Sequence, residues 1–339
     1  MSVTLPDLPL PESAKGRIVI TCMRNEGAWI VEWIAWHLAA GFGHFLVYTN
    51  DCEDPTEAIL DRLGEMGLVT RRDNARKAGQ RASYQIRALR RARREDLVRA
   101  AEWAAILDAD EFLAIKAGEG RLDDLFAAAG PADVVSIPWR VFGSGGRLDY
   151  DRGPVTRAFR LAAPEFCPRP AQAWGMKSLF RPDRIEVFGL HRPKVPAGGD
   201  WSSIRWVDAE GRPMPERYHA LERGGWRFGR DNITYRVAQV NHYAVKSAQS
   251  YLMKVLRGSA HGGMPRDAGY WRAMDRNEVE DRSADLLAPA ADRVMAALLS
   301  DPVLADLHRA AQDWHAAEIE RALSRADMAS LMAALREDA

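Results

Sequence analysis

Residues 17–49 read RIVITCMRNEGAWIVEWIAWHLAAGFGHFLVYT, and this stretch decides the fold class. Its first seven residues form a largely apolar, β-branched run, which is typical of a strand buried on both faces of a sheet. Ile30, Trp33 and Leu38 then recur at helical spacing and indicate a helix with one apolar face. The apolar run at 44–49 predicts a second strand, so the stretch is a strand–helix–strand unit.

The same alternation continues toward residue 111. Asp54 and Pro55 are typical of the start of a helix, and a short strand is expected at residues 68–70. The pattern then predicts a long Arg-rich helix over 80–98 and a fourth strand over 103–107. Alternating units of this length predict a mostly parallel sheet with helices on both faces. Ligands of such sheets bind beyond the carboxyl ends of the strands, where this chain carries its polar clusters.

The rest of the chain changes character twice. Short β-rich runs at 134–138, 155–161, 185–188 and 235–240 alternate with loops rich in Gly, Pro and Trp, and Ala-rich helical patterns follow Ser247. We therefore expect an N-terminal extension over 1–16, an α/β domain over 17–245 and a helical C-terminal region over 246–339.

Composition excludes several classes of protein. The chain has 339 residues, with 47 Lys plus Arg and 47 Asp plus Glu, so its formal net charge is zero. This balance disfavours bulk nucleic-acid binding, and no apolar run is long enough to cross a bilayer. The three cysteines, Cys22, Cys52 and Cys167, match no metal spacing and indicate reduced thiols in a cytoplasmic protein.

Two carboxylates follow the fourth strand directly. Asp108 and Asp110 are two residues apart, and residues at that spacing point the same way along a strand. Both could therefore meet one hard divalent cation, which prefers carboxylate, water and phosphate ligands. The alternative is a cluster that caps the next turn.

Four ordered stretches between residues 17 and 258 resemble motifs of GT-A glycosyltransferases, in particular a family-2-like bacterial group that shares motifs with family 92. They are CMRNE at 22–26 with IVEW at 30–33, FLVY at 45–48 with Asp51, LDADEF at 107–112, and NHY at 241–243 with Lys246, Lys254 and Arg257 after it. The resemblance implies a GT-A domain over 17–245 with a helical extension. It also implies metal-dependent, inverting transfer of a sugar from a UDP-linked donor.

The resemblance also assigns roles to residues of this chain. The nucleotide-sugar donor would contact Arg24, Asn25, Glu26, Asp51, Gln80, Asp108, Lys246 and Arg257, with Arg81 and Lys254 as further candidates. The cofactor would be Mn²⁺ or Mg²⁺, held by Asp108, Asp110 and His242. His191 is the rival to His242 as the third ligand.

A Gly-rich loop resembles the acceptor or sugar loop of the same group. It contains Phe142, Gly143, Ser144 and Gly146, and its glycines permit close backbone approach to a ligand; an ordinary hairpin loop is the alternative. An inverting enzyme needs a carboxylate base, and the sequence does not choose among Glu111, Asp149, Asp151 and Glu165. The catalytic base, the sugar and the acceptor (glycan, lipid or protein) stay open.

Two other functions compete with this interpretation. A haloacid-dehalogenase-like phosphatase also carries D-x-D after a strand, but the late position of the motif and the Glu111-Phe112 pair after it argue against that class. A non-catalytic protein that binds a sugar nucleotide or a partner is the second alternative. The arginines of 80–98 spread round the helix and indicate a solvated face rather than a nucleic-acid patch.

Overall fold

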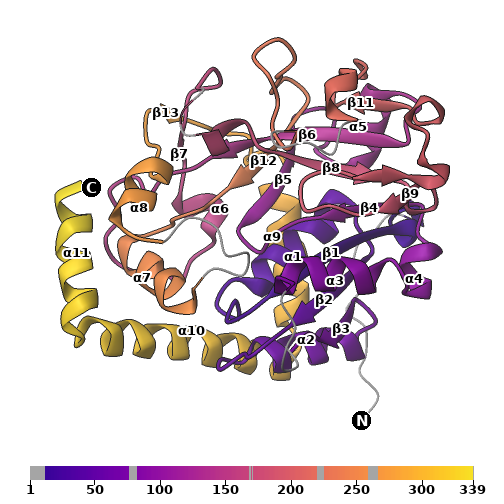
Figure 1. The fold of residues 1–339 in the computed structure, drawn as a ribbon. Coiled ribbons are helices and arrows are strands. Elements are labelled where there is room, and N and C mark those ends of the chain that lie inside the picture. Colours follow the sequence, from indigo (N-terminus) through magenta and orange to yellow (C-terminus); the bar gives the residue numbers. More distant parts are fainter. Residues whose placement is uncertain are drawn as a thin grey trace.

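The computed structural model describes residues 12–75, 82–167, 169, 171–219, 225–258 and 266–338. The predicted donor residues Gln80 and Arg81 lie outside the described residues. The chain forms one large sheet with helices on both faces, and a belt of C-terminal helices runs around its edge (Figure 1).

The first half of the sheet is parallel, as predicted. Its order is β3-β2-β1-β4, formed by β1 (Arg17–Met23), β2 (His44–Thr49), β3 (Val69–Asp73) and β4 (Trp103–Ile106). The strand–helix–strand unit is confirmed, with α1 (Ile30–Ala40) between β1 and β2, and α2 (Thr56–Glu65) leads into β3. Gly41 ends α1 with φ 102°, a left-handed conformation that glycine adopts without a Cβ clash.

The second half of the sheet is mixed. β8 (Met176–Phe180) lies between β4 and β6 (Val134–Val141) and is antiparallel to both. β12 (Ala238–His242) and β11 (Trp206–Asp208) pair with β6 in the parallel sense. β5 (Glu111–Ile115) is antiparallel to β12. Two antiparallel steps separate β4 from β6, so β4 and β12 run in the same direction. Their carboxyl ends therefore share one rim of the sheet.

Two sequence predictions were wrong locally. The helix expected over 80–98 is broken into α3 (Tyr84–Ala92) and α4 (Asp96–Arg99), and at the break Glu95 accepts two hydrogen bonds from Arg72, both 3.0 Å long. The strand expected over 155–161 is mostly the helical turn α6 (Val155–Ala158). The buried Glu32 carboxylate accepts hydrogen bonds from the first two backbone N–H groups of α6, 2.8 and 3.1 Å, which overrides the β-propensity of that segment.

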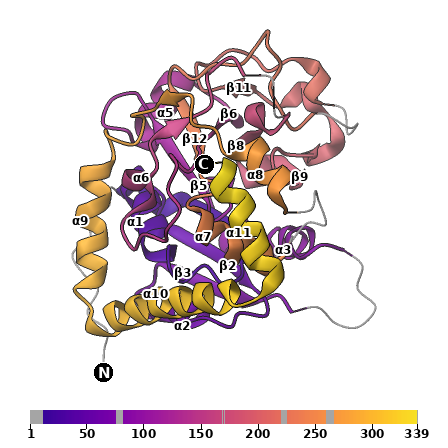
Figure 2. The same ribbon diagram turned by 90° about the vertical axis from the view of Figure 1, so that its left-hand side faces the viewer.

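The predicted helical C-terminal extension is confirmed. It consists of α7 (Ala248–Arg257), α8 (Ala268–Met274), α9 (Ala288–Leu299), α10 (Pro302–Leu323) and α11 (Ala326–Asp338). α9 packs on α1, α10 runs along α2 and α7, and α11 turns back onto α7 and α8 (Figure 2). The other short elements are α5 (Leu122–Ala129), β7 (Leu161–Ala162), β9 (Ile185–Val187), β10 (Val195–Pro196) and β13 (Val279–Glu280).

The core is split by the sheet into two layers. One apolar cluster lies under α1, α2, α5 and α9, and the other lies under α3, α7, α8 and α11. This arrangement confirms the predicted α/β class with helices on both faces. Among the described residues, no helix has both the length and the apolar character needed to span a bilayer.

Candidate functional site

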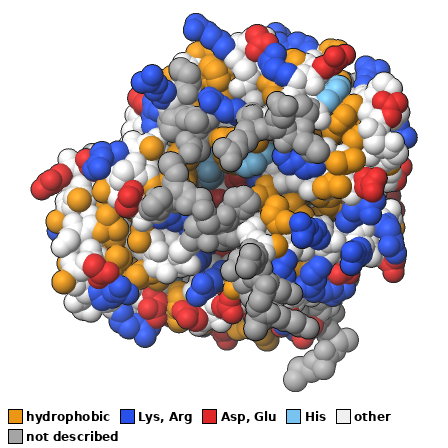
Figure 3. All heavy atoms as spheres, in the orientation of Figure 1, with side chains coloured by type: hydrophobic (Ala, Val, Ile, Leu, Met, Phe, Trp, Pro, Cys, Tyr) orange, Lys and Arg blue, Asp and Glu red, His pale blue; other side chains and the backbone are white. Residues whose placement is uncertain are grey.

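A cavity of about 230 Å³ opens at the rim where β1, β4 and β12 end. In the surface view, His and acidic side chains lie at the bottom of a hollow on this face (Figure 3). Seven of the predicted site residues line the cavity: Arg24, Glu26, Asp108, Asp110, His242, Lys254 and Arg257. The fold therefore brings together groups from the first and last motifs of the chain.

Asp108 lies in the turn after β4 and is held by two side chains. Its carboxylate accepts hydrogen bonds from Gln85 Nε2 at 2.9 Å and from Lys177 Nζ at 3.0 Å. Burial raises the pKa of Asp108, but the Lys177 ammonium outweighs it, so the pKa lies below its ordinary value. Lys177 is buried in β8 and also contacts Glu111 Oε2 at 3.0 Å. Asp108 is therefore a fixed, ionised carboxylate.

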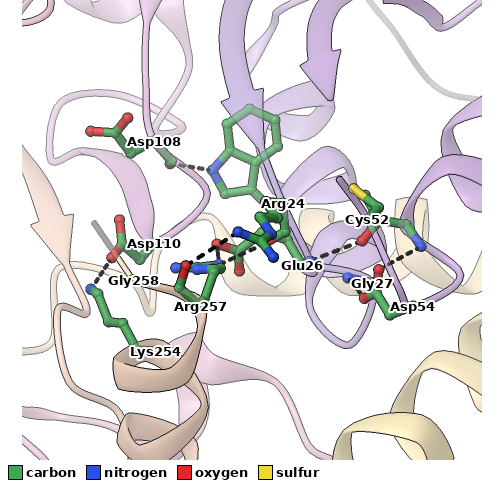
Figure 4. A network of polar contacts seen from close by, with 12 residues as sticks. Arg24, Glu26, Gly27, Cys52, Asp54, Asp108, Asp110, Lys254, Arg257 and Gly258 are labelled. Atoms are coloured by element: carbon green, nitrogen blue, oxygen red, sulfur yellow. Dashed lines mark hydrogen bonds and ion pairs between the residues drawn. The ribbon is translucent and has the colours of Figure 1, made fainter. Parts of the chain in front are cut away.

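Asp110 faces a different set of partners. Its Oδ2 accepts a hydrogen bond from Lys254 Nζ at 2.6 Å, and its Oδ1 lies 3.7 Å from His242 Nε2. Burial raises the pKa of Asp110, but Lys254 and His242 outweigh it and hold the pKa well below its ordinary value. Figure 4 shows Lys254 reaching Asp110, with Asp108 on a separate side. The two carboxylates thus do not point at one common partner, because Asp108 and Asp110 lie in a turn rather than in a strand.

His242 lies beside Asp110, as its position in sequence predicts, but within β12 rather than after it. The pairing of His242 with Glu111 across β12 and β5 fixes this placement. His191 instead packs against Trp139 and Trp226, with ring centroids 5.1 and 5.2 Å away, and burial lowers the pKa of His191 to about 3. Of the two rival histidines, His242 is the one within 4 Å of Asp110.

The donor atoms fit a divalent cation in part. Across the described ranges, no group of three or more His, Cys, Asp or Glu side chains is placed to hold a metal ion. Asp110 and His242 form an adjacent oxygen and nitrogen pair, and the buried Nδ1 of His242 has no hydrogen-bond partner in the described structure. The Asp110 carboxylate suits Mn²⁺ or Mg²⁺, whereas the His242 imidazole suits Mn²⁺ better than Mg²⁺, and a substrate and water would supply the other ligands.

A second cluster ties the loop after β1 to the loop after β2. Arg24 Nε donates to the backbone oxygen of Asp51 at 3.1 Å, and Asn25 Oδ1 accepts from the Glu53 N–H at 2.8 Å. Asn25 and Asp51 have φ values of 51° and 49°, in the left-handed region that Asn and Asp tolerate best after glycine. Tyr84 donates to Asp51 Oδ2 at 2.9 Å. These loops therefore form a preset polar wall.

Arg257 joins that wall to α7. Its Nη1 donates to the backbone oxygen of Arg24 at 3.0 Å and forms an ion pair with Glu26 (Figure 4). Lys246 lies on the other side of this pair, in a smaller cavity of about 90 Å³ that Lys254 and Arg257 also line. Its Nζ lies 4.5 Å from the centre of the Trp29 ring, and burial lowers the pKa of Lys246 to about 8. The three cations of the last motif thus share one cavity.

The predicted acceptor loop is packed against residues 275–277. A Cβ at Gly143 would lie 2.5 Å from the backbone oxygen of Arg276, and the Gly145 N–H donates to Asn277 Oδ1 at 2.7 Å. Phe142 and Ser144 are buried, and Gly146 has φ 73°. The close approach that these glycines permit is to the chain itself, and none of the four predicted loop residues lines either of the two cavities.

The four candidate bases also stay apart from the cavity. Glu111 is buried against Lys177, Asp149 accepts from Gln249, and Asp151 and Glu165 lie near arginines. The carboxylates that do line the cavity are Glu26, Asp108 and Asp110. The catalytic base remains unassigned.

Sequence reasoning missed several residues of the site. Lys177, Tyr84, Gln85, Arg266 and Tyr270 all contact or line it. For Lys177 a signal existed, because it is the single charge in the apolar run Met176-Lys-Ser-Leu-Phe180. The other four belong to loops or helix starts, which carry no periodic signal.

Comparison with known proteins places these observations in a family. Residues 18–207 match glycosyltransferase family 92. A glycosyltransferase family 92 protein of rice, Oryza sativa subsp. japonica, is 28% identical over 200 residues, which are 54% of this chain and 32% of the rice protein. The chain therefore spans about a third of the length of the relative that it matches.

Solved structures of TarS from S. aureus are also similar. Its 1–349 fragment in complex with UDP-GlcNAc is 18% identical, with a TM-score of 0.28 and coverage of 40% of this chain and 37% of that chain. The same fragment without that ligand is 12% identical, with a TM-score of 0.35 and coverage of 84% and 73%. These scores are too low to bear on fold or ligand. The family match covers more than half of the chain and confirms the resemblance seen in its motifs, and the chain therefore belongs to glycosyltransferase family 92.

Proposed function

We propose that this chain transfers a sugar from a UDP-linked donor to an acceptor hydroxyl, with inversion and with Mn²⁺ or Mg²⁺. The observation that carries the proposal is the meeting of Asp108, Asp110 and His242 with Lys254 and Arg257 at one rim of the sheet. Membership of a glycosyltransferase family supports it and argues against the phosphatase alternative.

The polar wall formed by the loops after β1 and β2 suits a nucleoside. Arg24 lines the cavity and is held by its hydrogen bond to the Asp51 backbone oxygen, so it faces a donor without first having to be ordered. Asp51, which accepts a hydrogen bond from Tyr84, does not itself line the cavity. Asp108, fixed by Lys177, supplies an ionised acceptor of hydrogen bonds from ribose hydroxyls. In this assignment the nucleoside lies between β1 and β4.

The cations of α7 suit the diphosphate. Lys254 and Arg257 already neutralise Asp110 and Glu26 from the cavity wall, and Arg266 lies beside them through hydrogen bonds to Lys254 and Gly258 backbone oxygens. Charge-assisted hydrogen bonds from such groups are about twice as strong as neutral ones. They would stabilise the diphosphate as the leaving group.

Asp110 and His242 are the residues that would hold the cation. When bound, the cation supplies Lewis-acid neutralisation of the diphosphate. The chain's own contribution is to orient the pair: the β12–β5 pairing fixes His242, and the Tyr243 N–H donates to the Asp110 backbone oxygen at 2.9 Å.

A thermal-shift panel of nucleotide sugars, with and without Mn²⁺, tests the proposal. A ligand that binds only the folded chain raises its stability by RT ln(1 + [L]/Kd), so a true donor should stand out, and more so with Mn²⁺. Asp110→Asn should lose the Mn²⁺-dependent part of the shift. Asp149→Asn, a carboxylate outside the cavity, is the matched control.

Two outcomes would contradict the proposal. The absence of a shift with every nucleotide sugar would remove the donor assignment. An unchanged Mn²⁺ effect in Asp110→Asn would remove the metal assignment but leave sugar-nucleotide binding in place.

A further inference from the structure

A larger groove of about 920 Å³ lies beside the carboxylate cavity, between α3 and the segment that includes β9. Its walls are mostly aliphatic or aromatic, with Ile86 and Leu89 on α3 facing Val187, Phe188 and Leu190. Val187 is a large hydrophobic residue that is 44% exposed. In the surface view, hydrophobic side chains bordered by Lys and Arg side chains cover this side of the hollow (Figure 3). The groove thus exposes apolar surface to solvent.

Cations surround this apolar groove. Arg90 of α3, Arg93 and Arg94 in the turn directly after α3, and Lys194 line it, against one acid, Glu186. The three arginines are exposed, and within the described part of the chain none of their guanidinium groups has a hydrogen bond or ion pair. The structure therefore leaves a set of positive charges over the groove without internal counterions.

The two other arginines of α3 form hydrogen bonds within the protein. Arg87 donates to the backbone oxygen of Ala75 at 2.9 Å, and Arg91 donates to that of Asp73. The sequence predicted that all of these arginines, spread round the helix, are solvated. The structure instead divides them into two that hold the neighbouring loop and three that face the groove.

The inner end of the groove meets the candidate active site. Trp139 and His191 line the groove. The centre of the Trp139 ring lies 4.6 Å from the centre of the His242 ring and 5.8 Å from Lys177 Nζ. Lys177 in turn holds Asp108. A small cavity lined by Leu89 and Leu190, which also line the groove, extends to Asp108, so the inner end of the groove lies next to the carboxylates.

We propose that the groove binds the acceptor, and that the acceptor is an aliphatic lipid carrying a phosphate. The proposal rests on the proposed function and names the acceptor class for it. The lipid chain would lie on the aliphatic walls, its phosphate would pair with Arg90, Arg93 and Arg94, and a hydroxyl of the same lipid, the one to be glycosylated, would lie toward Trp139. A bare oligosaccharide fits less well, because its many hydroxyls would lose water hydrogen bonds against these walls.

Calorimetric titration of the full chain with decyl phosphate tests the inference. Decanol, inorganic phosphate and maltotriose serve as comparison ligands that carry only the chain, only the phosphate or only sugar. We expect decyl phosphate to bind at least about tenfold more tightly than each of them, since charged hydrogen bonds and apolar burial act together. Its affinity should fall as salt is raised.

Matched variants locate the site. Arg93→Glu/Arg94→Glu should weaken decyl phosphate binding by about tenfold or more, because two attractive charges become repulsive. Val187→Asp should also weaken it, through the apolar wall. Arg336→Glu, an exposed arginine on α11 without an ion pair in the described structure, should leave it unchanged.

The outcomes separate the two proposals. If decyl phosphate binds no better than inorganic phosphate or maltotriose, or if Arg93→Glu/Arg94→Glu binds it as the wild type does, the inference is overturned. Binding of UDP-sugar should persist in both groove variants. If the wild type binds no nucleotide sugar, the proposed function fails; if it binds the sugar nucleotide but not decyl phosphate, only the acceptor assignment fails.

Discussion

The rim of the sheet and the groove beside α3 both carry charged side chains, but among the described residues those of the rim are paired with opposite charges and those of the groove are not. At the rim, partly buried carboxylates have buried or partly buried cations as partners: Asp108 with Lys177, and Asp110 with Lys254. In the groove, exposed arginines such as Arg93 lie over apolar walls with no such partner in the described structure. A paired, buried charge is costly to disturb, whereas an unpaired, exposed one is free to meet a ligand.

The largest effect should come from the rim. Lys177→Met leaves the fully buried Glu111 carboxylate and the partly buried Asp108 without their shared cation, so we expect the free energy of unfolding to fall by about 3–5 kcal/mol. Urea denaturation measures this loss. Lys15→Met removes an exposed lysine that also pairs with a carboxylate, Glu12, and should cost less than about 1 kcal/mol. Equal costs for the two variants would contradict the contrast between buried and exposed pairs.

His242 tests whether the rim serves a ligand as well as the fold. We expect His242→Ala to reduce Mn²⁺-dependent donor turnover by about 100-fold, in the range seen when a preorganised group at a catalytic centre is removed. Its melting temperature should change much less than its activity. A variant that loses stability but keeps Mn²⁺-dependent turnover would mark His242 as a core residue.

Lys246 should make the free energy of unfolding depend on pH. Burial lowers its pKa from 10.5 to about 8, so between these values the unfolded chain binds more protons than the folded chain. Through this group the free energy of unfolding therefore rises as pH increases from 8 to 10.5. Lys246→Met should lose that rise and be more stable than the wild type at pH 7 by about 3 kcal/mol.

Denaturation curves of both proteins at pH 7 and pH 10 measure the difference. A gap between wild type and Lys246→Met that stays constant across this window would show that the Lys246 ammonium is not buried at a cost. Lys15→Met, whose lysine is exposed, should track the wild type at both pH values.

The smallest effect should come from the groove. Arg93→Glu/Arg94→Glu should change the free energy of unfolding by less than about 0.5 kcal/mol, because the guanidinium groups are exposed and unpaired. The same denaturation assay measures it. A loss comparable with that of Lys177→Met would mean that these arginines support the fold, and the contrast between the two regions would fail.

Local patterns predicted the parallel half of the sheet well. The strands at 17–23 and 44–49 were confirmed to the residue, because continuous apolar runs and a glycine stop are signals within one short window. The segment 155–161 was misassigned, since its helical turn depends on Glu32, more than a hundred residues away. Tertiary partners of this kind leave no trace in a window of ten residues.

The candidate site was predictable in part for the same reason. Asp108, Asp110 and His242 follow or end strands, so a sheet with parallel β4 and β12 was enough to bring them to one rim. The direction of their carboxylates was not predictable, because it depends on Lys177 from β8 and Lys254 from α7. The metal assignment itself stays a prediction.

The order of synthesis gives the β12–β5 pairing a further consequence. β5 emerges from the ribosome early, but its partner β12 lies more than a hundred residues later. The cationic partners of Asp110 and Glu26, Lys254 and Arg257, lie 144 and 231 residues downstream of them. Contacts of such long sequence separation form slowly. The nascent chain therefore holds an unpaired strand edge until β12 has been made and uncompensated acids until α7 has been made, and this interval is when it should depend most on chaperones.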